Sequence, residues 1–298
     1  MIDGIINIYK EKGYTSHDVV AILRGILHQK KIGHTGTLDP DAEGVLPVCL
    51  GRATKLCELL TDKEKVYRAG LLLGMETDTQ DISGRVLAQR QVTTGEAAFR
   101  AALTSMIGEI NQIPPMYSAI KVNGKKLYEL ARAGKTIERA PRRIRIYDIE
   151  PLSVELPRAT LRVRCSKGTY IRTLCHDIGS ICGCGGVMTS LVREKSGIFS
   201  LEDSLTLDQV RELHLSGELP ERIRTLSDTL SDYPAFICNE AHEKALLNGN
   251  RLLPDWGRAE KTAGKMRVFT QDGRLVGLYE WRGEALVPSI MLLTGANE

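Results

Sequence analysis

Two neighbouring stretches in which apolar and polar residues alternate place the tightest limit on the fold of this chain. Residues 144–154 and 159–165 repeat with the period of two that is typical of half-buried strands, so they predict a pair of adjacent strands. Further strands are expected at 2–9 and 66–73, and helices at 15–27, 53–60, 93–107 and 170–181. Because these elements are interleaved without a regular strand–helix–strand repeat, they favour an α+β fold over a doubly wound parallel sheet.

Length and composition exclude several classes of protein. The chain has 298 residues, of which 42% are hydrophobic and 26% charged, so it is able to bury a substantial core. No apolar run approaches the roughly 18 residues that a membrane span needs, and the N-terminal residues lack the basic start and long apolar core of a secretory signal. We therefore expect a cytoplasmic protein that does not bind membranes and keeps its seven cysteines reduced.

Charge is distributed unevenly along the chain. Residues 121–172 contain 14 Lys or Arg but only 5 Asp or Glu, whereas residues 200–244 contain 4 Lys or Arg and 10 Asp or Glu. A charge map of this kind can steer a polyanion to one face of a protein, although an ordinary solvated surface would explain it as well. Nucleic acid is therefore a candidate partner.

The sequence pattern changes after Tyr233 and Pro234. A short helix is expected at 240–247, and the pair Asp272-Gly273 between two alternating apolar runs predicts a β-hairpin. We therefore expect two domains, a larger one over residues 1–232 and a small β-rich one over residues 233–298.

The densest polar segment, residues 33–47, is expected to belong to a glycine-rich loop over 33–51. Three carboxylates at alternate positions resemble the start of a calcium loop, but Leu50 stands where the bidentate Glu is needed. Asp39 precedes a proline and is flanked by glycines, which let a ligand approach the backbone closely. A carboxylate so placed is a candidate nucleophile or general base, and its alternative role is an Asx-type turn.

Residues 166–177 contain the second candidate. If a helix begins near Thr169 or Tyr170, Arg172 lies in its first turn, where its guanidinium can favour the ionised form of a nearby carboxylate. The alternative is an ordinary surface arginine. The nearby cysteines and His176 do not have the spacing of a zinc site, so we expect no metal.

Six segments together resemble the tRNA pseudouridine synthase B (TruB) family over nearly the whole chain. The most specific are the catalytic motif G-H-x-G-T-L-D-P-x-A-x-G-x-L-P and the motif K-G-T-Y-I-R. The matching segments in chain order are 10–20, 33–47, 74–84, 114–121, 167–172 and 191–199. Glu11, Val192 and Glu194 depart from the residues that are usual in the family.

The resemblance implies a pseudouridine-synthase catalytic domain with a central mixed or antiparallel sheet and flanking helices, followed by a small PUA-like RNA-binding domain. It implies that uridine at position 55 in the TΨC loop of tRNA is isomerised to pseudouridine. Asp39 would be the essential nucleophile or base, with Arg172 as its charge partner. Tyr67 would stack on the uracil and relay the proton lost from C5; without the resemblance, a tyrosine in mid-strand is more typical of the core.

Five further residues are assigned to the substrate by the same resemblance. Tyr170 and Leu191 match positions that line the base pocket, and His34 matches the histidine that fills the stack after the base is flipped out. Asp81 and Lys121 match polar residues near the site. The family needs no cofactor or metal, binds the tRNA TΨC stem-loop, and requires no obligatory protein partner, so a monomer is expected.

Three other functions compete with this one. A carboxylate-pair hydrolase of glycosides would use Asp39 with Asp41, Glu43 or Asp81, and would not bind nucleic acid. A non-catalytic RNA-binding protein would bind tightly in low salt but leave every base unmodified. The same isomerisation on a different RNA is the third alternative.

Overall fold

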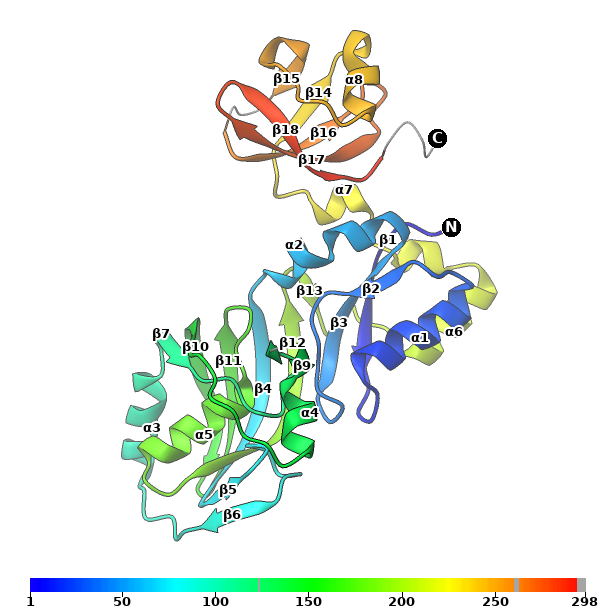
Figure 1. The fold of residues 1–298 in the computed structure, drawn as a ribbon. Coiled ribbons are helices and arrows are strands. Elements are labelled where there is room, and N and C mark those ends of the chain that lie inside the picture. Colours follow the sequence, from blue (N-terminus) through cyan, green and yellow to red (C-terminus); the bar gives the residue numbers. More distant parts are fainter. Residues whose placement is uncertain (123, 260–262, 294–298) are drawn as a thin grey trace.

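The computed structural model describes residues 1–122, 124–259 and 263–293, which are organised around a large sheet and a smaller one (Figure 1). The large sheet has nine strands, in the order β1-β3-β12-β4-β11-β10-β7, with β2 added beside β3 and β13 beside β12. These strands are β1 (Gly4–Lys10), β2 (Ile32–His34), β3 (Glu43–Leu50), β4 (Lys65–Leu73), β7 (Gly108–Gln112), β10 (Arg142–Glu155), β11 (Arg158–Cys165), β12 (Gly186–Ser196) and β13 (Phe199–Ser200).

Strand pairing in the large sheet is almost entirely antiparallel. The two alternating stretches form β10 and β11 and pair with each other as predicted. One pair differs, because β12 runs parallel to β3 while it runs antiparallel to β4. The sheet is therefore mixed, and the α+β prediction is confirmed.

The predicted loop over 33–51 is wrong in its second half. Residues 43–50 form β3, which lies between β1 and β12 in the large sheet, and Val45 through Leu50 are buried. This run is apolar throughout and does not alternate, because a strand with both faces covered needs no polar side. Glycines on both sides of the run indicated a loop, and they concealed the strand.

Helix α1 (Ser16–Leu27) begins at a capping box, in which the Thr15 hydroxyl accepts from the Asp18 backbone and the Asp18 carboxylate accepts from the Thr15 backbone. Its apolar face packs with α6 (Leu207–Ser216) in one core cluster over β1 and β3. Figure 1 shows these two helices side by side at one end of the large sheet.

Helices α3 (Glu96–Ser105) and α5 (Ile171–Ile181) share the core of the other half of the sheet. Helix α5 approaches β12 very closely, because a Cβ atom on Gly179 would lie only 2.1 Å from the backbone nitrogen of Gly186. Only glycine fits at position 179, and this contact fixes the distance between the helix and the strand.

Short elements complete the large unit. They are α2 (Cys57–Thr61), preceded by a 3₁₀ helix at Gly51–Leu56, then α4 (Leu127–Arg132), α7 (Leu226–Thr229), and the strand pairs β5 (Met75–Thr77) with β6 (Val86–Gln89) and β8 (Lys121–Val122) with β9 (Lys125–Lys126). In the described part of the chain no helix is both long and apolar enough to cross a membrane.

The smaller sheet has the order β15-β14-β16-β17-β18 and its own apolar core. Its elements are β14 (Ala235–Cys238), α8 (Glu243–Leu247), β15 (Gly257–Ala259), β16 (Lys265–Phe269), β17 (Leu275–Arg282) and β18 (Ala285–Met291). Strands β16 and β17 form the predicted hairpin around Asp272-Gly273. Leu278 and Leu292 also join a cluster with Ile5 and Val45 of the large sheet, so the two sheets share apolar contacts.

We predict that Leu292→Ala destabilises the protein by about 2–5 kcal/mol, because it leaves a cavity in the cluster that joins the two sheets. Urea denaturation, followed by circular dichroism, measures the free energy of unfolding. Leu215→Ala is the matched control, since Leu215 is 81% exposed and its loss should change this free energy by less than about 0.5 kcal/mol. Equal effects of the two substitutions would contradict the shared cluster.

Candidate active site

A cleft of about 240 Å³ opens on the large sheet beside the loop that joins β2 to β3. Five of the residues selected from the sequence line it, namely Asp39, Tyr67, Tyr170, Arg172 and Leu191. They come from that loop, β4, the start of α5 and β12, so tertiary folding brings together residues that lie far apart in the chain.

The loop that carries Asp39 is held by the segment that leads into α1. The Lys10 ammonium group donates to the Pro40 carbonyl at 3.1 Å, and the Gly13 backbone N–H donates to the same oxygen at 2.9 Å. On the other side of Asp39, the Leu38 backbone N–H donates to the Ser16 hydroxyl at 2.9 Å. Both neighbours of Asp39 are therefore fixed in place.

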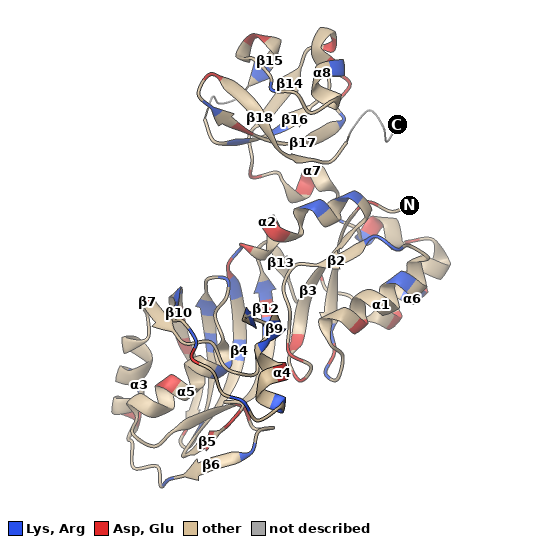
Figure 2. Ribbon diagram, viewed as in Figure 1, with Lys and Arg blue, Asp and Glu red and all other residues tan. Residues whose placement is uncertain are grey.

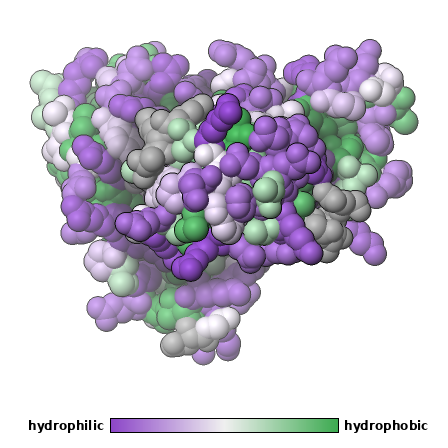
Figure 3. All heavy atoms as spheres, turned by 90° about the horizontal axis from the view of Figure 1, so that it is seen from above, coloured by the Kyte–Doolittle hydropathy of each residue, from purple (hydrophilic) through white to green (hydrophobic). Residues whose placement is uncertain are grey.

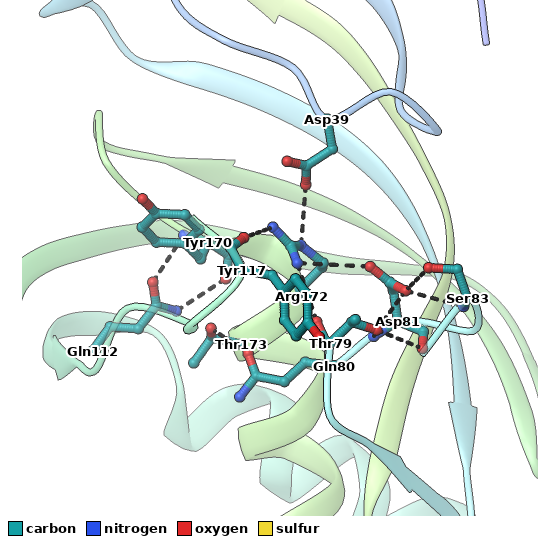
Figure 4. Close-up of polar contacts among 10 residues, drawn as sticks. All are labelled: Asp39, Thr79, Gln80, Asp81, Ser83, Gln112, Tyr117, Tyr170, Arg172 and Thr173. Atoms are coloured by element: carbon teal, nitrogen blue, oxygen red, sulfur yellow. Dashed lines mark hydrogen bonds and ion pairs between the residues drawn. The ribbon is translucent and has the colours of Figure 1, made fainter. Parts of the chain in front are cut away.

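Arg172 lies in the first turn of α5, as predicted, and its side chain is only 6% exposed. Its Nε lies 3.0 Å from the Asp39 carboxylate, while Nη1 and Nη2 donate to the carbonyls of Thr79 and Tyr117 at 3.1 and 2.8 Å. Nη1 also lies 3.7 Å from the Asp81 carboxylate. Figure 4 shows Asp39 and Asp81 approaching the guanidinium from different directions.

Asp81 belongs to the turn between β5 and β6, and the turn holds its carboxylate firmly. One oxygen accepts hydrogen bonds from the Thr79 hydroxyl at 2.8 Å and from the backbone and hydroxyl of Ser83 at 3.0 and 2.6 Å. Asp81 is not among the residues that line the cleft, and it contacts the site through Arg172.

The charge of Asp39 results from two opposing effects. Burial by the surrounding protein raises the pKa of this carboxyl above its ordinary value, and the Arg172 guanidinium beside it lowers the pKa. The side chain is nevertheless 46% exposed, so the carboxylate faces the open cleft while the arginine behind it is closed off. A ligand in the cleft therefore meets the carboxylate directly.

Two tyrosines face this carboxylate from other elements. Tyr67 lies in the middle of β4, and burial raises the pKa of its hydroxyl. Tyr170 immediately precedes α5, and its backbone N–H and carbonyl are both hydrogen-bonded by the side chain of Gln112, at 2.8 and 3.1 Å. These contacts, drawn in Figure 4, fix the start of the helix that carries Arg172.

His34 and Lys121 lie outside the lining of the cleft. His34 ends β2 and packs edge-on against His17, with ring centroids 5.3 Å apart. Burial lowers the pKa of His34 to about 4, so its ring is uncharged at neutral pH. Lys121 is exposed in β8. The structure thus brings five predicted residues together and attaches Asp81 to them through Arg172.

Sequence reasoning missed three buried cationic residues around the cleft, namely Lys10, Lys65 and Arg193. Burial lowers the pKa of both lysines to about 8. Lys65 donates to the carbonyls of Thr61 and Lys63. Arg193 donates to the carbonyls of Val45 and Gly36. The only available signal was a Lys or Arg within an otherwise apolar strand.

Metal binding has no support in the described ranges. No three His, Cys, Asp or Glu residues among them are grouped as metal ligands would be. Cys175 and Cys184 are buried as free thiols, and Cys182 is a partly buried one.

Two family models match most of the chain. Residues 24–171 match the model described as "TruB family pseudouridylate synthase (N terminal domain)", and residues 172–231 match "tRNA pseudouridylate synthase B C-terminal domain".

Individual relatives agree with these models. Proteins named tRNA pseudouridine synthase B from Alkaliphilus oremlandii and Lachnoclostridium phytofermentans are each 50% identical to this chain, over 255 and 293 residues. The aligned parts cover 86% and 94% of this chain, and 84% and 95% of the relatives. A chain in the crystal structure of a Cbf5-Nop10-Gar1 complex aligns with a TM-score of 0.76 and 27% identity, covering 99% of this chain and 86% of that chain.

Fold, cleft and relatives together define a pseudouridylate synthase. Among these enzymes, the chain belongs to the TruB family.

We predict that Lys10→Met lowers the free energy of unfolding by about 2 kcal/mol, because the carbonyls of Glu11, Tyr14 and Pro40 lose the buried ammonium group that donates to all three. Lys12→Met is the matched control, since Lys12 is exposed and makes only a 4.0 Å ion pair with Asp41. Chemical denaturation of both variants tests the role of Lys10 in holding the Asp39 loop, and equal stabilities would refute it.

Proposed function

We propose that this protein isomerises uridine to pseudouridine at position 55 in the TΨC loop of tRNA. The observation that carries the proposal is the 3.0 Å ion pair between Asp39 and a buried Arg172, which holds a carboxylate at the mouth of the cleft. Membership of the TruB family and relatives named tRNA pseudouridine synthase B support it.

Asp39 is the essential catalytic carboxylate in this proposal. The N1–C1′ bond breaks, the uracil turns, and C5 bonds to C1′ in its place. An ionised Asp39 either attacks C1′ or removes a proton from the sugar, and the Arg172 guanidinium favours that ionised form. No redox step or external group is needed, so we propose no cofactor or metal.

The tyrosines and Leu191 would hold the base. A uracil inside a folded RNA loop is out of reach until it is flipped out, and it would enter the cleft between Tyr67, Tyr170 and Leu191. The ring of Tyr67 would stack on the uracil, and its hydroxyl would accept the proton lost from C5. Asp81 would keep Arg172 aimed at Asp39.

His34 and Lys121 would contact RNA outside the cleft. An uncharged, flat imidazole suits the gap that the flipped base leaves in the stack, and the lowered pKa of His34 keeps it uncharged. Lys121 is exposed and free to approach a phosphate.

The large sheet offers a surface for the RNA backbone. Lys and Arg residues recur along β10 and β11 in Figure 2, and part of their charge is balanced by ion pairs to Glu64, Glu109, Glu150 and Glu194. The face seen in Figure 3, which views the molecule from the side of the smaller sheet, is also mostly hydrophilic, with hydrophobic residues in small groups. Such a surface suits contacts with phosphates.

We propose residues 1–232 as the catalytic domain and residues 233–298 as a PUA-like RNA-binding domain. In support of this boundary, the family models end at residue 231 and the smaller sheet begins at Ala235. The partner we propose is the TΨC stem-loop of tRNA in the cytoplasm, bound by a monomer that requires no other protein.

Tritium release from tRNA transcript containing 5-³H-uridine tests the reaction. The wild-type protein should release tritium, because bonding of C5 to C1′ frees that hydrogen. Asp39→Asn should release none while binding tRNA within a few-fold of wild type. Asp41→Asn is the matched control, since Asp41 lies two residues away with an exposed side chain, and it should be fully active. Tritium release by Asp39→Asn would remove Asp39 from the chemistry.

A triple substitution tests the smaller domain. Lys244, Arg251 and Arg258 are exposed cations on its surface, and changing all three to Gln should weaken tRNA binding by about tenfold or more and flatten its dependence on salt. Filter binding over a range of salt concentrations measures both. The pair Arg211→Gln and Arg222→Gln in the acidic segment is the control, and an equal loss from both sets would remove the RNA role from the smaller domain.

A further inference from the structure

Arg193 is among the largest side chains that are fully buried in the described part of the protein, and it lines the same cleft as Arg172. It lies near the middle of β12 and is 1% exposed. A long cationic side chain is rarely buried so completely unless its charge is paired or has a function.

The hydrogen-bond partners of Arg193 are neutral. Its Nε donates to the Val45 carbonyl at 2.7 Å, and its Nη2 donates to the Gly36 carbonyl at 3.1 Å. Within the described ranges no carboxylate forms an ion pair with it, whereas Arg172 has two. Its positive charge therefore remains available inside the sheet.

Strand register places this charge beside Tyr67. Arg193 lies directly opposite Tyr67 in the antiparallel pair of β12 with β4, and directly opposite Gly44 in the parallel pair with β3. Residues opposite each other in an antiparallel pair project from the same face, and here both line the cleft. The nearby guanidinium lowers the pKa of the Tyr67 hydroxyl, although burial raises it more.

We propose that Arg193 is a positioning residue for Tyr67, which holds the phenol in the cleft and stabilises the negative charge that the Tyr67 oxygen carries before it takes the proton from C5. This inference rests on the proposed function. Each arginine would then stabilise one negative charge. Arg172 would stabilise the Asp39 carboxylate near the sugar, and Arg193 would stabilise the Tyr67 oxygen near the base.

The proton transfer balances without any other reactant. Tyr67 first releases its phenol proton to water. Once C5 is bonded to C1′, C5 still carries its hydrogen, and the phenolate oxygen of Tyr67 takes it as a proton. The electron pair of the C5–H bond forms the C5–C6 double bond, and the C6–N1 π pair moves to N1, which takes a proton from water. The transfer restores the Tyr67 phenol, so no net proton is gained or lost.

The test compares substitutions at Arg193 with a matched one at Arg68. Arg193→Gln removes the charge, Arg193→Lys keeps it, and Arg68→Gln makes the same change next to Tyr67, on an exposed side chain paired with Glu194. The rate of conversion is measured for each folded variant in single turnovers on two tRNA transcripts. One transcript is made with ordinary uridine and the other with uridine deuterated at C5. Filter binding measures tRNA affinity in parallel.

We expect Arg193→Gln to slow conversion by about tenfold to a hundredfold, with tRNA affinity within a few-fold of wild type. Its rate should also become sensitive to deuterium at C5, because removal of that proton becomes the slow step. Arg193→Lys should recover part of the rate and lose part of the isotope effect. Arg68→Gln should equal wild type in its conversion rate and in its isotope effect.

Arg193 also braces the backbone on both sides of the Asp39 loop, so a slow variant alone would not show that it acts through Tyr67. A slow Arg193→Gln with an isotope effect equal to that of wild type would overturn the inference, as would a fully active one. If Arg193→Gln does not fold, Arg193→Lys decides by the same isotope comparison. A wild-type protein that converts no uridine would instead refute the proposed function.

Discussion

The buried guanidinium of Arg172 is the interaction on which the site depends. Three separate segments meet on it, namely the Asp39 loop, the turn that contains Thr79 and Asp81, and the carbonyl of Tyr117. Because the arginine is closed off from solvent and bonded to backbone oxygens, its geometry does not depend on a ligand. The carboxylate that faces the cleft is therefore held in place before any RNA arrives.

Much of this arrangement could be predicted from local patterns. Alternation predicted β10 and β11, the helix expected at 15–27 corresponds to α1, and the position of Arg172 in the first turn of α5 followed from the helix expected at 170–181. Motif resemblance selected the residues that line the cleft. Strand β3 was missed because its continuous apolar run lies between glycines, which indicate turns in any sequence-based interpretation.

The buried cations could not be predicted, and the reason is physical. A lysine or arginine in a strand has the same local pattern whether it points to solvent or into the protein. Lys65 and Arg193 are buried because neighbouring strands and loops cover them, and those contacts join residues more than a hundred positions apart, as between Arg193 and Val45. Tertiary structure decides whether such a side chain is buried, and the local sequence pattern does not indicate it.

The close approach of Gly179 to the backbone of Gly186 has a consequence for how the protein can evolve. The distance between the end of α5 and the start of β12 is set there by main chain against main chain, with no side chain between them. Apolar residues elsewhere in the core, such as Ile178 or Leu161, can therefore be exchanged for others of similar size while the helix keeps its distance. Sequence drift in the core therefore leaves this contact between helix and strand unchanged.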